Sequence, residues 1–389
     1  MAESKLRPGL LRFFLIITSI IGLLHIYIGA RILDAFPLTP LAHAIVIFLV
    51  FLAFAALTMG FLARFIISDS KYADLFSWIG MLSLGFFSSV LVLTFLRDIV
   101  LVISHLFFNY SFVAKLHLYS ESGVLVASAL ASLIGLIAVI RIPDVIHVNI
   151  PIKNLSPDLK DFTLVQLSDI HIGPTIKGNY LASIVAQVNQ LKPDLVAITG
   201  DLVDGNVETL QADVAPLQDL KSRYGTFFVT GNHEYYSGVS DWILYLKFLG
   251  IHVLINEHRI LQHNNSKVVI AGICDYSAGG FIKQHTPNPE LALAGTESLN
   301  ALKIMLAHQP RSAADIARTD AHLQLSGHTH GGQFWPWNFF VRLQQPYNVG
   351  LHKLHHLWIY INRGTGYWGP PMRLGKRSEI TLIRFIDQQ

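Results

Sequence analysis

Five short apolar runs in the last two-thirds of the 389-residue chain are each followed by side chains of the kinds that bind metal ions. The runs, at residues 162–167, 195–199, 226–230, 304–307 and 323–326, have the length and character of buried strands. The polar residues that follow them are Asp169 and His171, Asp201, Asn232 with His233 and Glu234, His308, and His328 with His330. Because open α/β sheets build their sites at the carboxyl ends of strands, we expect these side chains to converge.

The chemical types of these residues indicate a metal centre. The first three groups lie about thirty residues apart, which is the length of a strand, a crossover helix and a return strand. The candidate ligands are Asp169, His171, Asp201, Asn232, His308, His328 and His330. This mixture of oxygen and nitrogen donors suits manganese, iron or zinc better than magnesium or calcium. Because one tetrahedral ion takes only about four ligands, the sequence predicts two divalent metal ions per chain.

The order of the motifs resembles the calcineurin-like metallophosphoesterases, whose pattern D-x-H, G-D-x-x-D, G-N-H-E, H and G-H-T-H is complete here. The resemblance covers residues 162 to 385. It points to the bacterial branch of YkuE-type and YaeI-type phosphodiesterases, through the stretches 327–333 and 362–373. The resemblance implies an α/β fold, an αββα sandwich of two mixed sheets flanked by helices.

The resemblance also implies the division of the ligands between the two metals. One metal would be held by Asp169, His171 and His330, and the other by Asn232, His308 and His328. Asp201 would bridge the two ions. Two adjacent cations can share a bridging hydroxide and hold a phosphoryl oxygen for in-line attack, so no protein nucleophile is needed.

His233 stands where the family keeps its catalytic histidine. An imidazole can protonate a departing alkoxide or stabilise the transition state, because it titrates near neutral pH. We expect Asp204 and Glu234 to orient ligand histidines or waters. Arg373 is a candidate phosphate-binding residue because a guanidinium matches phosphate geometry, with a structural salt bridge as the alternative. The single cysteine, Cys274, lies in an apolar stretch and is expected to be structural.

The N-terminal third of the chain has a different character. The mean hydropathy of +0.44 arises almost wholly there. Four apolar stretches, at residues 11–30, 43–66, 75–96 and 123–140, are long enough to span about 30 Å of hydrocarbon. The sequence therefore predicts a membrane domain with four transmembrane helices over residues 1–144, a short linker over 145–160, and a phosphoesterase domain over 161–389. The pair Arg97 and Asp98 is expected at the membrane interface, with a charge pair inside the membrane as the alternative.

The basic residues near the four stretches predict the orientation in the membrane. If the N-terminus is inside, the inside residues are Lys5, Arg7, Arg12, Arg64, Lys71 and Arg141, and the outside residues are Arg31, Arg97 and Lys115. This bias of about two to one favours a cytoplasmic N-terminus. Because the number of spans is even, the phosphoesterase domain would share that side. The spans and the charge bias predict a multi-pass membrane protein with a cytoplasmic catalytic domain, and the resemblance to the bacterial branch implies a bacterial inner membrane.

The expected partners are a lipid bilayer and a phosphoester substrate. The short linker would keep the catalytic domain near the bilayer. The aromatic segment Phe334 to Phe340 either packs beneath a loop or contacts the bilayer interface, which Trp and Phe favour. We expect hydrolysis of phosphomonoester, phosphodiester or pyrophosphate bonds by a metal-bridging hydroxide, on a lipid-linked substrate. A membrane transporter or sensor regulated by a metallophosphoesterase-like domain is the alternative. The low content of charged residues, 14%, without a basic stripe argues against a nucleic-acid partner.

Overall fold

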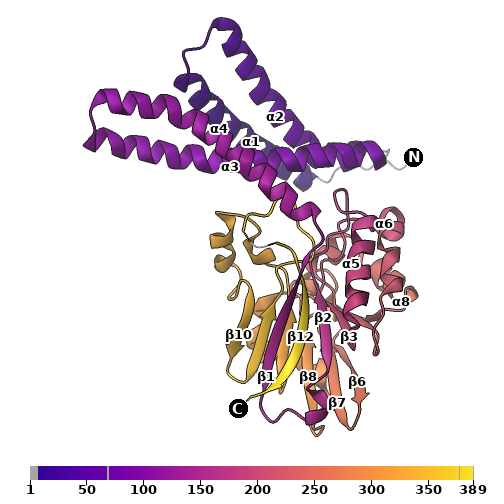
Figure 1. Cartoon of the computed structure of the whole chain (residues 1–389). Helices are drawn as coiled ribbons and strands as arrows, with labels where there is room; N and C mark the ends of the chain where they lie inside the picture. Colours follow the sequence, from indigo (N-terminus) through magenta and orange to yellow (C-terminus); the bar gives the residue numbers. More distant parts are fainter. Residues whose placement is uncertain (1–7, 68–69, 376, 389) are drawn as a thin grey trace. The chain divides into compact units, whose positions relative to one another are not determined.

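The computed structural model of the protein describes residues 8–67, 70–375 and 377–388 (Figure 1). The chain divides into two compact units, one built almost wholly from residues up to Leu136 and the other from residues after it. The first unit is helical and the second is an α/β unit with two sheets.

Four long helices make up the first unit. They are α1 (Pro8–Ala35), α2 (Pro40–Ile66), α3 (Ser70–Phe107) and α4 (Tyr110–Ile140). The start of α2 is fixed by Thr39, whose hydroxyl accepts a hydrogen bond from the Ala42 N–H, and by Pro40 in the first turn. All four helices are long and apolar enough to cross a bilayer. The prediction of four membrane helices is therefore confirmed, although each helix extends beyond its predicted stretch.

The additional helical turns carry charged residues that pair with one another. The Arg97 guanidinium lies 3.2 Å from a Glu121 carboxylate oxygen and 3.1 Å from one of Asp98. Asp98 also lies 2.7 Å from the Arg31 guanidinium and accepts a hydrogen bond of 2.6 Å from the Tyr27 hydroxyl. The predicted stretches ended beside these charges, because an isolated charge is costly in an apolar helix. Pairing offsets much of that cost, so the helices continue past the predicted ends.

The α/β unit contains two six-stranded sheets in the described residues, with the orders β1-β12-β2-β3-β4-β5 and β10-β11-β9-β8-β7-β6. The first sheet comprises β1 (Asp144–Ile152), β12 (Glu379–Asp387), β2 (Thr163–Leu167), β3 (Leu195–Ile198), β4 (Thr226–Phe228) and β5 (His252–Val253). The second comprises β10 (Gly350–Leu354), β11 (Leu357–Ile361), β9 (Leu323–Ser326), β8 (Ala301–Leu306), β7 (Ser266–Gly272) and β6 (Glu257–His263). Both sheets contain parallel and antiparallel neighbours, so they are mixed.

Helices and short 3-10 turns connect the strands of the α/β unit. The α-helices are α5 (Gly178–Leu191), α6 (Val207–Val214), α7 (Asn232–Tyr236), α8 (Val239–Phe248), α9 (Pro289–Leu293) and α10 (Ala313–Ile316). The 3-10 helices are η1 (Pro157–Leu159), η2 (Ala215–Asp219), η3 (Ala278–Gly280), η4 (Lys283–His285), η5 (Pro310–Ser312), η6 (His330–Gly332) and η7 (Trp337–Leu343). Figure 1 shows α5, α6 and α8 gathered beside β2 and β3.

The main core lies between the two sheets. It joins Leu164 and Phe227 of the first sheet to Ile270, Ile304 and Leu325 of the second, all of them almost fully buried. A second cluster packs α9 and α10 on the other face of the second sheet. Strand β3 is buried along its whole length, as is usual for a parallel strand covered on both faces. The predicted αββα arrangement of two mixed sheets is confirmed.

Strand β1 occupies the first half of the segment that sequence analysis assigns to a linker. It pairs in parallel with β12 along its whole length, from Asp144 opposite Glu379 to Ile152 opposite Asp387, and Figure 1 shows the two strands side by side. Ile150 and Ile152 are buried in the main core. The β-branched residues of this segment favour a strand, and the partner that accepts it comes from the far end of the chain. Only residues 141–143 separate α4 from β1.

We predict that β1 is required for the α/β unit to fold by itself. A fragment starting at Ile142 should unfold cooperatively, whereas one starting at Leu155 lacks β1 and its two buried isoleucines. Burial of two such side chains contributes roughly 3 kcal/mol or more. Urea unfolding followed by circular dichroism compares the fragments. Equal midpoints would show that β1 is only a connecting segment.

Candidate metal centre

The predicted ligands converge at the carboxyl ends of neighbouring strands. Asp169 and His171 follow β2, Asp201 follows β3, Asn232 begins α7 after β4, His308 follows β8, and His328 and His330 follow β9. Strands β2, β3 and β4 are adjacent in one sheet, and β8 and β9 are adjacent in the other. The centre therefore forms where the same ends of the two sheets meet.

The backbone at the centre is strained. Five of the seven predicted ligands have φ angles between 51° and 69°, in the left-handed region: Asp169, His171, Asp201, His328 and His330. This region costs a residue with a Cβ about 1–2 kcal/mol. Such residues persist only where the surroundings hold them, and they cluster at functional sites. The loops turn sharply enough to aim these side chains at one small volume.

Two motif glycines allow the loops to approach each other. A Cβ atom at Gly327 would lie 1.9 Å from the Ser168 hydroxyl oxygen and 2.0 Å from an Asp169 carboxylate oxygen. A Cβ atom at Gly231 would lie 2.1 Å from a carboxylate oxygen of Asp201. Any larger residue at either position would collide with a predicted ligand, so the glycine is needed for space.

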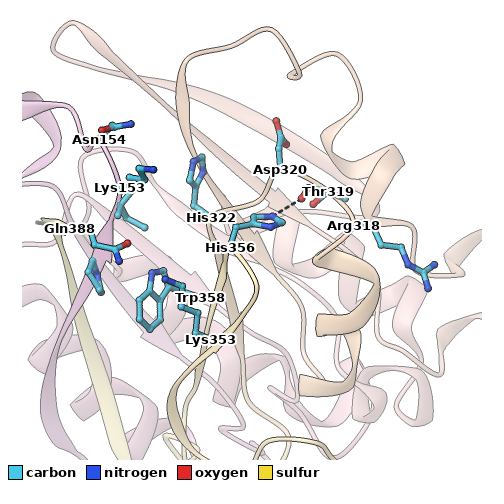
Figure 2. Close-up of a pocket in the computed structure, with 12 residues that line it drawn as sticks. Lys153, Asn154, Arg318, Thr319, Asp320, His322, Lys353, His356, Trp358 and Gln388 are labelled. Atoms are coloured by element: carbon cyan, nitrogen blue, oxygen red, sulfur yellow. Dashed lines mark hydrogen bonds between the residues drawn. The ribbon is translucent and has the colours of Figure 1, made fainter.

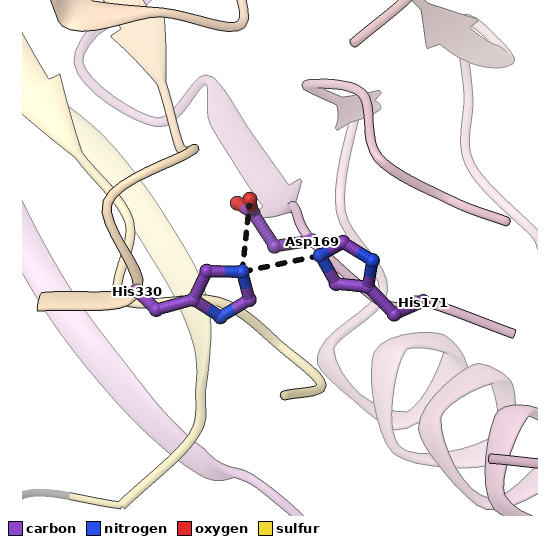
Figure 3. Close-up of side chains that lie close together, drawn as sticks. All are labelled: Asp169, His171 and His330. Atoms are coloured by element: carbon purple, nitrogen blue, oxygen red, sulfur yellow. Dashed lines mark hydrogen bonds and ion pairs between the residues drawn. The ribbon is translucent and has the colours of Figure 1, made fainter. Parts of the chain in front are cut away.

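One group of ligand atoms comprises Asp169, His171 and His330, all within 4.8 Å of one another. Figure 3 shows the two imidazoles edge to edge beside the carboxylate, with 3.1 Å between their Nε2 atoms. The His330 Nε2 lies 3.5 Å from Asp169 Oδ1. Burial lowers the pKa of His330 well below its usual value and so favours the neutral imidazole, which is the form that binds metal.

A second group comprises Asp201, His308 and His328. The His308 Nε2 lies 3.1 Å from Asp201 Oδ2 and 3.2 Å from His328 Nδ1. Burial lowers the pKa of His328 to about 3, which again favours a neutral ligand. The side-chain oxygen of Asn232 is buried and has no hydrogen-bond partner among the described residues. A buried oxygen without a hydrogen-bond partner is unfavourable, and a bound cation would satisfy it. The two groups of donors therefore fit two divalent cations.

Asp201 lies between the two groups. Its Oδ2 atom is 3.1 Å from the His308 Nε2 and 3.9 Å from the His171 Nε2. Its Oδ1 atom accepts a hydrogen bond from the backbone N–H of His233. Burial favours the protonated carboxyl, but the facing histidines hold the pKa of Asp201 well below its ordinary value. The carboxylate is thus ionised and faces both groups, as a bridging ligand must.

Asp204 accepts hydrogen bonds from two histidines with one carboxylate oxygen. The Nδ1 atom of His171 is 3.0 Å from this oxygen and that of His233 is 2.6 Å from it. Fixing Nδ1 in this way turns the Nε2 atom of each ring toward the centre. Although burial opposes the charge on His233, its bond to Asp204 and the neighbouring carboxylates raise its pKa to about 9. Its Nε2 atom lies 3.9 Å from Asp201 Oδ2.

The carboxylate of Glu234 holds backbone N–H groups of the ligand-bearing loops. Its buried carboxylate accepts N–H hydrogen bonds from Asp201 at 3.0 Å, Leu202 at 2.8 Å and Gly231 at 2.6 Å. These bonds join the loops after β3 and β4, which carry Asp201 and Asn232. Glu234 therefore sets the distance between two ligand-bearing loops, which differs from its predicted role.

Arg373 is buried, and its guanidinium is held by backbone carbonyls. Only 2% of the residue is exposed, and its guanidinium donates to the backbone carbonyls of His330, Arg363 and Gly366. The alternative, a structural salt bridge, is not formed by Arg373 among the described residues. Instead, Arg373 holds the segment that carries His330. A sequence motif cannot distinguish a buried guanidinium from an exposed one, because the difference depends on distant packing.

The structure adds three aromatic residues that sequence analysis missed, Tyr236, Phe281 and Trp368, here called the aromatic rim. The ring centre of His233 lies 5.4 Å from that of Tyr236 and 5.7 Å from that of Trp368, and Phe281 lies 5.7 Å from Tyr236. All three are more than half exposed. The Gln333 side chain makes two hydrogen bonds to the backbone of Trp368 and holds its loop. Tyr236 follows the G-N-H-E motif closely in the sequence, and this position was the signal from which its place near the centre could have been predicted.

The structure supports a structural role for Cys274. The residue is 1% exposed, and burial raises the pKa of its thiol to about 12. It packs with Tyr235, Val239 and Ala278 in a small cluster. A thiol in this environment stays protonated at neutral pH and is a poor nucleophile.

Comparisons with known proteins agree with this geometry. Residues 162–332 match the family model for the calcineurin-like phosphoesterases. An uncharacterized metallophosphoesterase of Campylobacter jejuni is 33% identical over 381 residues, which cover 95% of this chain and 97% of that protein. The chain belongs to the calcineurin-like metallophosphoesterase family. Its α/β unit is a metal-dependent phosphoesterase domain, and the resemblance seen in the sequence is confirmed.

Relatives with membrane segments occur in animals. A transmembrane protein with metallophosphoesterase domain from Danio rerio is 40% identical over 267 residues, 67% of this chain and 61% of that protein. The chain thus spans about three-fifths of the length of that relative. The metallophosphoesterase YkuE of Bacillus subtilis is 31% identical over 232 residues, which cover 57% of this chain and 78% of YkuE. The four apolar helices and the transmembrane relative from Danio rerio together support a membrane protein.

We predict that Asp201→Ala removes metal from both groups of ligands. Its carboxylate lies between them, so its loss should lower metal content from about two ions per chain to less than one and abolish hydrolysis. Mass spectrometry of metals in the purified protein gives the stoichiometry. The exposed Asp241→Ala variant is the control, and it should keep both ions. An Asp201→Ala protein with two ions and most of its activity would rule out bridging.

Proposed function

We propose that the protein is a membrane-anchored, two-metal phosphoesterase whose substrate has an apolar leaving alcohol, as in a lipid-linked phosphoester. The observation that carries this proposal is the placement of Asp201 between two ligand groups with His233 and the aromatic rim beside it. The donor set suits manganese, iron or zinc.

The residues divide the chemistry between them. Asp169, His171 and His330 would hold one cation, Asn232, His308 and His328 the other, and Asp201 both. When bound, two such cations act as Lewis acids on the phosphoryl oxygens and lower the pKa of a shared water for in-line attack. Asp204 and Glu234 keep the ligand-bearing loops and the histidine rings in position.

His233 is placed to give a proton to the leaving group. Its Nδ1–H donates to Asp204, which leaves the Nε2 side facing the centre. The Asp204 carboxylate that accepts the Nδ1–H raises the pKa of His233, which favours the protonated imidazole that a general acid requires. The leaving oxygen must then lie within hydrogen-bond distance of Nε2.

A leaving group within reach of His233 Nε2 also lies close to the aromatic rim. A leaving group that takes a proton from His233 lies beside Tyr236 and Trp368, whose rings flank the imidazole. Exposed aromatic side chains gain free energy when an apolar group covers them. This arrangement favours a bulky apolar alcohol over a small polar one.

The exposed aromatic side chains of the segment after His330 support the proposal that the substrate lies in the bilayer. Trp335, Trp337, Phe339 and Phe340 are between 43% and 64% exposed, and Leu343 is 80% exposed. Phe334 is buried, so packing beneath a loop describes this residue. Contact with the bilayer interface is the interpretation that we propose for the exposed residues. Trp and Phe prefer the boundary between lipid and water. We place the domain on the cytoplasmic side of a bacterial inner membrane from the basic bias of the sequence.

The alternative of a transporter or sensor has less support. The charged side chains of the helical unit described above pair with each other. Paired charges that join helices stabilise packing, whereas a transport path needs ionisable groups that face a cavity filled with water.

We predict that His233→Ala lowers kcat for an alkyl phosphoester by roughly 10²–10⁴, the usual effect of losing a general acid. The loss should be much smaller for a p-nitrophenyl ester, because nitrophenolate leaves without a proton. Metal content should stay unchanged, as in the control His252→Ala. Loss of metal would make His233 a ligand, and equal losses for both esters would exclude proton donation.

We predict that the aromatic rim selects apolar leaving groups. Ethyl, butyl and octyl phosphate, tested also as methyl diesters, release alcohols of similar acidity but different length. For the wild-type protein kcat/KM should rise at least about tenfold from ethyl to octyl, because each buried methylene contributes about 0.8 kcal/mol. Trp368→Ala should lose most of that rise, whereas the control Phe248→Ala, on exposed α8 surface, should keep it. An equal loss for all three alcohols would instead mean that Trp368 positions His233.

A further inference from the structure

We propose that the α/β unit has a second ligand site, a cleft that binds a small phosphorylated molecule. The cleft has a volume of about 640 Å³ and is lined by the end of β1, the residues before β9 and the β10–β11 hairpin. The side chains that carry the argument are Lys153, Asn154, His322, Lys353, His356 and Trp358 (Figure 2).

The cleft lies at the opposite strand ends from the metal centre. His322 immediately precedes β9, whereas the ligands His328 and His330 follow it. The four residues of β9 span roughly 13 Å at the usual rise of a strand. In the described residues no group of metal-ligand type lies at the cleft. We therefore assign it to binding and not to hydrolysis.

The cleft carries excess positive charge. Lys153 and Lys353 are exposed on its walls, and neither forms an ion pair within the described residues. The carboxylate that lines it belongs to Asp320, which is already bound by the ammonium group of the buried Lys303. Arg318 is also at the edge and lies 3.5 Å from Asp315. Because no described carboxylate neutralises the ammonium groups of Lys153 and Lys353, the cleft favours an anionic ligand.

The Asn154 amide and the His322 ring add hydrogen-bond donors to the cleft. The Nδ1 atom of His322 accepts the backbone N–H of Lys303 at 3.1 Å, so the ring hydrogen is on Nε2. Within the described part of the chain this Nε2–H has no partner. His356 is fixed by donating its Nε2–H to the carbonyl of Thr319 at 2.8 Å. Figure 2 shows Lys153 and Asn154 on one side of the cleft and these two histidines on the other.

Donors on both walls match a phosphate group, which has only acceptor oxygens when fully ionised. The volume is far larger than a phosphate ion needs and falls in the range of sites for small organic ligands. Trp358 gives the cleft an apolar surface, over which the Lys353 ammonium is held 4.6 Å from the ring centre. A nucleoside or sugar phosphate, with a charged end and a larger neutral part, fits these features together.

The test is a calorimetric titration of the full-length protein with adenosine monophosphate, glucose 6-phosphate and glycerol 3-phosphate at constant ionic strength. Adenosine and inorganic phosphate are the comparison ligands. We expect at least one organic phosphate to bind at least about tenfold more tightly than both comparison ligands. Absence of binding at millimolar concentrations of all three would overturn the proposal.

Because the metal centre also binds phosphoesters, variants must separate the two sites. The double charge reversal Lys153→Glu and Lys353→Glu should weaken the binding at least about tenfold and leave hydrolysis of a small ester unchanged. Lys247→Glu, on exposed α8 surface, is the control and should bind as the wild type does. Asp201→Ala should also keep this binding. Binding that disappears in Asp201→Ala but survives the double reversal would belong to the metal centre and refute the cleft.

Discussion

The carboxylate of Asp201 connects every part of the metal centre. One oxygen faces His308 and His171, which belong to different ligand groups, and the other accepts the N–H of His233. The backbone of Asp201 also bonds in two directions, to the N–H of His171 and to the carboxylate of Glu234. The distance between the ligand groups and the position of His233 therefore depend on this residue. An error in the packing of β3 would disturb all of them together.

The packing of the two sheets brings the ligand-bearing strand ends together around Asp201. The main core holds the sheets face to face, so strand ends from both sheets come to the same edge. Close approach at that edge requires glycine where a Cβ would touch Asp169 or Asp201. Asp204 then fixes the ring of His171 through a hydrogen bond, and Arg373 fixes the backbone of His330 by donating to its carbonyl. Core packing thus determines the geometry of the ligands.

The ligands could be predicted from the sequence because each is a local pattern: an apolar strand followed by a residue of the right chemistry. Asp169, Asp201 and His308 needed no knowledge of distant contacts. The features that escaped prediction all depend on partners far away in the chain. Strand β1 requires β12, the aromatic rim joins three separate segments, and burial of Arg373 follows from carbonyls in two other loops. Likewise, Arg97 is tolerated within a helix because Glu121 comes from the next one.

The left-handed backbone at five ligands means that this fold is less stable than its topology permits. At these positions a glycine would relieve strain, and asparagine would relieve part of it, so selection for stability alone would replace aspartate and histidine. Cation binding favours the strained conformation, since only the folded loops bring the donors together. The free energy of metal binding thus offsets the strain, and a chain in this family that no longer needed its metals would be expected to drift toward glycine at the ligand positions first.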